Sequence, residues 1–207
     1  MPAPTIAELV ALAVRLVNAG QREHARIVCE QAVAGHAPHP AVLQMLALLE
    51  MQDGRPAAAL AQARASLQLR PDHLPTLFLA GDAALAVRDL DAASTALERA
   101  VAVAPAEGEA WFRVSLVRQD RRDLSGAIAA LERTLALQPE RVDALVNLGI
   151  ALQESRRLDD ALRAYGRAYR LRAPTFGRIA HALATPGTGR LWLSLDDLRA
   201  ELLAQPA

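Results

Sequence analysis

The sequence has 207 residues, of which 52% are apolar, 22% charged and only 3% aromatic. A chain of this length fits one or two globular domains, and its composition excludes a disordered tail, a collagen-like fibre and a disulfide-stapled miniprotein. Its 23 basic residues balance 23 acidic ones, so overall charge favours neither nucleic acid nor an anionic membrane as a partner. All of the basic residues are arginine, a usage typical of GC-rich bacterial genomes.

Residues 1–21 have the leucine and valine spacing of a structural helix. They lack a basic stretch ahead of their apolar run and carry Glu8 inside it, so they do not read as a signal peptide, and we expect a cytoplasmic location. No uninterrupted apolar run approaches the roughly 18 to 20 residues of a membrane span, which predicts no membrane insertion. The single cysteine, Cys29, excludes intramolecular disulfides and multi-cysteine metal sites.

A regular period runs through the chain. Pro71, Pro105 and Pro139 recur at equal spacing. A register of the same period that starts at Ile6 also places a small residue at position 27 of every unit and alanine at position 20, namely at Ala25, Ala59, Ala93, Ala127 and Ala161. A fixed period of about 34 residues predicts a repeat architecture.

The pattern within each repeat unit predicts two short antiparallel helices. Apolar residues recur at helical spacing on both sides of a polar break near the middle of each unit, and proline ends the second helix because it lacks an amide hydrogen. One such hairpin cannot bury its apolar face alone, but stacked hairpins can. We therefore expect a solenoid over residues 1–175, with units at about 6–39, 40–73, 74–107, 108–141 and 142–175.

The remaining residues, 176–207, leave the repeat rhythm. They predict a capping helix over residues 176–183, a Gly/Pro turn, and a C-terminal helix that begins after Ser194, with Asp197 in a capping-box-like position. This tail caps the solenoid, fills its groove or mediates self-assembly, and the sequence leaves the three alternatives open. Trp192 is either a buried anchor or a contact for a partner.

The repeat pattern resembles the tetratricopeptide repeat. The fifth unit is the closest match, with Leu148 and Gly149 at positions 7 and 8 and Tyr165 at position 24. The resemblance implies an all-α, right-handed superhelical solenoid of about five 34-residue helix-turn-helix repeats, followed by the helical tail. Position 11 departs from the family pattern, because the charged residues Glu50 and Arg118 occupy a position whose side chain is normally packed. Either local pairing or a tilted unit would accommodate them.

The sequence contains no recognisable catalytic motif. It has no metalloprotease helix, no phosphate-binding glycine loop and no nucleophile elbow. His36 and His39 flank a proline on a loop between units, and solvent-exposed loop histidines are the ordinary interpretation, so we expect no metal. The chain is therefore expected not to be an enzyme and to need no cofactor, and its function should lie on a surface.

By resemblance to the family, a partner binds in the concave groove lined by the first helix of each unit. Reading the groove positions of this sequence gives an apolar half followed by a polar, mostly acidic half, which predicts a peptide or protein partner with an apolar and a basic portion. The predicted groove residues are Val10, Val14, Val17, Met45, Leu48, Met51, Phe78, Leu79, Asp82, Glu109, Phe112, Arg113, Asp120, Asp143, Asn147 and Glu154. The alternative is that the apolar members pack between helices and the acids form a solvated face.

The expected function is that of a non-catalytic scaffold or interaction module that binds a partner protein or another copy of itself. One alternative is a chaperone or carrier for a secreted or assembly subunit, and another is a regulatory accessory of an enzyme on another chain. Arg99, Arg133 and Arg167 share repeat position 26, but acids lie beside two of them. This interleaving predicts weak surface pairs and no nucleic-acid role.

Overall fold

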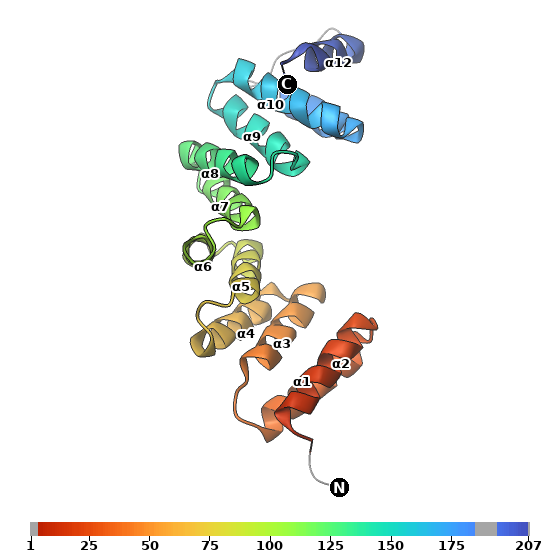
Figure 1. Cartoon of the computed structure of the whole chain (residues 1–207), viewed down its shortest axis with the longest axis vertical. Helices are drawn as coiled ribbons and strands as arrows, with labels where there is room; N and C mark the ends of the chain where they lie inside the picture. Colours follow the sequence, from red (N-terminus) through yellow and green to blue (C-terminus); the bar gives the residue numbers. More distant parts are fainter. Residues whose placement is uncertain (1–3, 185–193, 207) are drawn as a thin grey trace. The chain divides into compact units, whose positions relative to one another are not determined.

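Five helical hairpins follow one another along the chain in the computed structural model, which describes residues 4–184 and 194–206 (Figure 1). The first helices have 13 residues each and begin one repeat period apart: α1 (Ile6–Asn18), α3 (Pro40–Gln52), α5 (Leu74–Ala86), α7 (Gly108–Asp120) and α9 (Val142–Glu154). The second helices have 14 residues each: α2 (Arg22–Gly35), α4 (Pro56–Leu69), α6 (Leu90–Val103), α8 (Leu124–Leu137) and α10 (Leu158–Leu171). The predicted all-α fold of repeated helical hairpins is confirmed.

The first helix of every hairpin ends in the same left-handed turn. At repeat position 15, φ is +72° in Gly20 and +71° in Gly54, and it is +64°, +62° and +64° in Arg88, Arg122 and Arg156. In each turn two backbone amides bond back to the end of the helix, as when Gly54 donates to the Met51 carbonyl at 3.1 Å and Arg55 donates to the Glu50 carbonyl at 2.8 Å. This pattern is a Schellman motif, which satisfies helix-end carbonyls.

We expect Arg156→Gly to raise the free energy of unfolding. A left-handed conformation costs a residue with a Cβ roughly 1 kcal/mol that glycine does not lose, and Arg156 is exposed, so its replacement leaves no cavity. Gly54→Ala tests the same turn in the opposite direction and should lower stability by about 1 kcal/mol. Urea unfolding of both variants checks the pair. Two shifts of the same sign would contradict this account of the turn.

The chain divides into two compact units, Met1–Ala104 and Pro105–Ala207. The N-terminal unit contains α1–α6, in which each helix packs on the next and the first helices also touch, α1 with α3 and α3 with α5. The C-terminal unit contains α7–α10, the short 3-10 helix η1 (Ala173–Thr175), α11 (Phe176–Leu183) and α12 (Leu195–Ala204). The division expected from the sequence, between residues 175 and 176, remains a proposal.

Small residues let the helices approach closely. All five alanines of position 20 have no exposed surface, which confirms that this column is packed. Gly149 shows the reason most clearly, because a Cβ there would overlap the ring of Tyr165. The Tyr165 hydroxyl donates a hydrogen bond to Oε1 of Gln153 at 3.2 Å, and Nε2 of Gln153 donates to the Ala182 carbonyl at 2.7 Å. These contacts join α9, α10 and α11.

The described part of the C-terminal tail packs onto the last hairpin. Leu198 and Leu202 of α12 are buried in the same apolar cluster as Tyr165. Arg170 of α10 donates to three carbonyls at the C-terminus of α12, those of Leu202, Gln205 and Pro206, at 3.3, 2.9 and 2.9 Å. These helices therefore cover the apolar face that the last hairpin would otherwise expose, as a terminal repeat requires.

The structure tests the helices predicted in the C-terminal tail. The predicted helix over residues 176–183 is confirmed as α11, and Ser194 caps α12 by accepting a hydrogen bond from the Asp197 amide at 3.1 Å. Trp192, the predicted contact of the tail, lies outside the described residues.

The two charged residues at position 11 are satisfied by local pairing. Glu50 pairs with Arg26 at 2.5 Å and also with Arg55, and both arginines contact Asp53. Arg118 donates from Nη1 to the Gly126 carbonyl at 3.1 Å. Of the two explanations that the sequence leaves open, local pairing is therefore sufficient for both residues.

The Glu50 network predicts a loss of stability in acid. The hydrogen bond from Arg55, with that from Arg26, holds the pKa of Glu50 below its ordinary value. A carboxyl whose pKa is lowered by folding stabilises the fold above its unfolded pKa, and this contribution disappears as the pH falls through the folded pKa. We expect the Glu50→Gln variant to lose less stability than the wild type between neutral pH and about pH 3. Urea midpoints across that range that fall in parallel for the two proteins would contradict the expectation.

Candidate functional site

The apolar half of the predicted groove lies on the first helices of the N-terminal unit. Its residues project from α1, α3 and α5, and α3 contacts both of the others. Val14 is 40% exposed and the rest are half-buried. The structure therefore places on three neighbouring helices of this unit the residues Val10, Val14, Val17, Met45, Leu48, Met51, Phe78 and Leu79.

Two of these apolar residues also contribute to the core. Val10 and Met45 pack against the buried cluster formed by α1, α2 and α3. Packing between helices is therefore part of their role, as the alternative interpretation of the sequence proposed. Leu48 and Met51 lie on the same face of the unit and are better positions at which to test binding.

The polar half of the predicted groove contains a compact charged cluster in the C-terminal unit. Glu109 of α7 pairs with Arg113 one turn later and with Arg141 at 2.5 Å, and Arg141 immediately precedes α9. The Arg141 guanidinium lies 3.9 Å from the centre of the Phe112 ring, within the range of a cation–π contact. The structure thus brings Glu109, Phe112 and Arg113 together, and Arg141 joins them.

Other predicted acids of this unit have arginine partners as well. Asp143 of α9 pairs with Arg178 of α11 at 3.2 Å, and Glu154 at the end of α9 pairs with Arg122 at 3.3 Å. These pairs are exposed, so each contributes little to stability. The arginines of these pairs offset the negative charge that the groove residues by themselves would give this surface.

The other predicted polar residues are distributed over three helices. Asp82 is half-buried on α5, Asp120 is exposed at the end of α7, and Asn147 is half-buried on α9. Sequence reasoning missed Arg122, Arg141 and Arg178 because it examined only positions 2, 5, 6, 9, 12 and 13 of each unit. Arg141 could have been found from its place beside the first turn of α9, which contains Asp143.

Three candidate features other than a binding surface were the metal ligands, the cysteine and a membrane-spanning helix. In the part of the chain that the structure describes, no three histidine, cysteine, aspartate or glutamate side chains gather in an arrangement that could hold a metal ion. Burial raises the pKa of the Cys29 thiol to about 11, which makes it a poor nucleophile. None of the described helices has the length and apolar content that crossing a membrane requires.

Comparison with known proteins identifies the repeat. Residues 78–118 and 115–175 match the family described as Tetratricopeptide repeat. No curated protein matches the chain. Several solved structures share its fold at low sequence identity.

Among these structures, MamA from Desulfovibrio magneticus RS-1 has a TM-score of 0.77 and 21% identity, with 84% of this chain and 98% of that chain covered. YrrB, described as a TPR protein with an unusual peptide-binding site, has a TM-score of 0.78 and 16% identity, covering 86% and 91%. TTC0263 from Thermus thermophilus, described as a thermophilic TPR protein, has a TM-score of 0.65 and 23% identity, covering 87% and 100%. Residues 78–175 therefore carry the sequence pattern of the tetratricopeptide repeat, and the chain shares the fold of these solved structures.

Proposed function

We propose that this protein is a non-catalytic interaction module that holds an apolar segment of a partner protein on the first-helix face of its N-terminal unit. This face, called here the α1–α3–α5 face, consists of the eight apolar residues predicted from the sequence. The observation that carries the proposal is that these partly exposed side chains lie on three neighbouring helices, because α3 contacts both α1 and α5. A helical or extended segment could bury them together.

The composition of the face suits a partner that is mainly apolar. Met45 and Met51 provide side chains that adapt to different surfaces, and Phe78 provides a rigid aromatic anchor. Support for the basic portion of the expected partner is weaker, because Glu109, Asp143 and Glu154 already have arginine partners. The basic portion therefore remains a prediction. The peptide-binding site named for YrrB supports peptide binding as the general mode.

A photo-reactive amino acid at position 48 tests the proposal directly in the native host. We expect it to cross-link one partner protein, and we expect Phe78→Ala to abolish that cross-link. A matched probe at Leu69, which is 50% exposed at the end of α4, should not capture the same protein. Equal capture from both positions would refute binding on the α1–α3–α5 face.

The same experiment identifies self-assembly, the second form of the expected function. A cross-link to another copy of this chain would make the partner a second copy. Light scattering of the purified full chain would then give an oligomer, and Phe78→Ala should shift it toward the monomer. A monomer at all concentrations would exclude a second copy as the partner.

A further inference from the structure

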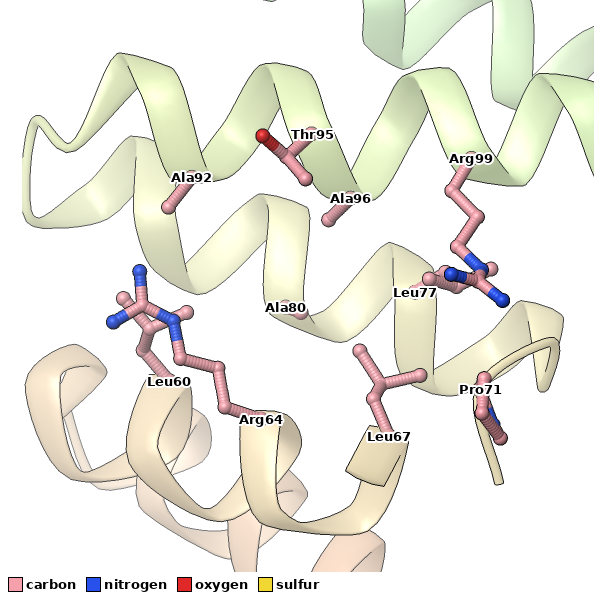
Figure 2. A pocket seen from close by; sticks show the side chains of 10 residues that line it. All are labelled: Leu60, Arg64, Leu67, Pro71, Leu77, Ala80, Ala92, Thr95, Ala96 and Arg99. Carbon is pink, nitrogen blue, oxygen red and sulfur yellow. The ribbon is translucent and has the colours of Figure 1, made fainter. Parts of the chain in front are cut away.

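The N-terminal unit contains an open pocket outside the α1–α3–α5 face. Its volume is about 320 Å³, and it lies between α4 and α6 with residues of α5 forming its floor (Figure 2). The floor residues Leu77 and Ala80 are 1% and 2% exposed. The pocket is lined by Leu60, Arg64, Leu67, Pro71, Leu77, Ala80, Ala92, Thr95, Ala96 and Arg99.

The floor of the pocket has a small residue where the other repeats have a larger one. Ala80 occupies repeat position 7, and the same position holds Leu12, Leu46, Val114 and Leu148 in the other units. In the second unit Leu46 lines a corresponding pocket of about 290 Å³ between α2 and α4, so a leucine at this position does not by itself close the space.

Two arginines line the pocket, and each has an aspartate partner outside it. Arg64 of α4 and Arg99 of α6 lie at opposite ends of it (Figure 2). No carboxylate stands among its described lining residues. Arg64 contacts Asp89 at 3.1 Å and Arg99 contacts Asp72 at 2.9 Å.

These ion pairs leave the guanidinium groups able to bind a ligand. The Arg64 and Arg99 side chains are 55% and 51% exposed, and exposed ion pairs contribute only about 0 to 1 kcal/mol. A guanidinium has five N–H donors, so each arginine can accommodate a second carboxylate beside its aspartate. A ligand with a carboxylate at either end therefore complements the pocket, whereas a basic ligand does not.

We propose that this pocket is a second peptide-binding site, which takes one large apolar side chain flanked by carboxylates. The apolar side chain occupies the space above Ala80, and the carboxylates contact Arg64 and Arg99. The site lies between second helices and shares no residue with the α1–α3–α5 face. It therefore stands or fails independently of the function proposed above.

The probe is a capped, fluorescein-labelled hexapeptide that carries one phenylalanine between glutamates. Fluorescence anisotropy with the full chain should show binding that weakens as salt is added, because the carboxylate contacts are screened. Replacing the phenylalanine of the probe by alanine, or its glutamates by lysine, should abolish binding. An absence of binding by the first probe at millimolar concentration would overturn the proposal.

The decisive variant is Ala80→Leu, which restores the residue found at this position in three of the other units. It should narrow the pocket and weaken probe binding by several-fold, because the apolar side chain of the probe loses space above residue 80. Arg99→Ala should weaken binding several-fold, and Arg133→Ala, at the same repeat position in the fourth unit, should leave it unchanged. Arg99→Ala keeps the proposal testable if Ala80→Leu does not fold.

Methyl NMR of the alanine-labelled chain locates the bound probe. Shifts at Ala92 and Ala96 with none at Ala161 would support the pocket. Binding that Ala80→Leu leaves intact and Phe78→Ala removes would place the probe on the α1–α3–α5 face and overturn the second site.

Discussion

Tyr165→Ala should destabilise the protein by about 3 to 5 kcal/mol, the range observed when a buried aromatic side chain is truncated. The Tyr165 ring has no exposed surface and packs against Gly149, and its hydroxyl bonds to Gln153. Removing the ring leaves a cavity between α9 and α10. The two helices already lie close together at Gly149, so they cannot move closer to fill it. The cost is a large part of the total stability of a typical domain, which is about 5 to 15 kcal/mol.

Tyr165→Phe is the matched control for this prediction. It keeps the ring and removes only the hydrogen bond to Gln153, so it should cost about 1 kcal/mol. Urea unfolding followed by circular dichroism measures both variants against the wild type. If the alanine and phenylalanine variants were equally stable, Tyr165 would not be the packing centre of the last hairpin.

Gly166→Ala is the second prediction with a large effect. A Cβ at Gly166 would lie 2.6 Å from the backbone carbonyl oxygen of Leu202 and 2.9 Å from Cβ of Gln205. Because the obstacle includes backbone, α12 must move away from α10, at a cost of about 1 to 3 kcal/mol. The loss should occur although alanine by itself favours a helix over glycine by about 1 kcal/mol.

The same substitution at Gly177 separates packing from helix propensity. No atom lies within 4 Å of a Cβ built on Gly177 in α11, so Gly177→Ala should not lower stability. Hydrogen exchange of the α12 amides should accelerate in Gly166→Ala and stay unchanged in Gly177→Ala. Unchanged protection of α12 in both variants would show that the close contact of α10 with α12 does not hold the tail.

The hairpins could be predicted from the sequence because each one repeats the same signals. The alanine column at position 20 and the evenly spaced prolines locate all five units, and the helices of the structure begin at the expected spacing. The left-handed turn was only partly predictable. Gly20 and Gly54 signal it, but Arg88, Arg122 and Arg156 adopt the same conformation without glycine, because the stacked hairpins impose it.

The candidate site was less predictable, because its charges depend on contacts across repeats. Groove positions alone gave a mostly acidic surface, but Arg141 and Arg178 come from outside those positions and pair with Glu109 and Asp143. The pocket between α4 and α6 was not predicted from the sequence, because its shape depends on how side chains of neighbouring hairpins pack.

The affinity of the cross-linked partner for the wild type and for a Leu48→Ala, Phe78→Ala double variant tests the central claim most directly. Isothermal titration calorimetry with the purified partner should show binding at least about tenfold weaker for the double variant, because two central apolar contacts are lost. A control variant, Leu69→Ala, should bind like the wild type. Unchanged affinity in a double variant that remains folded would contradict binding on the α1–α3–α5 face.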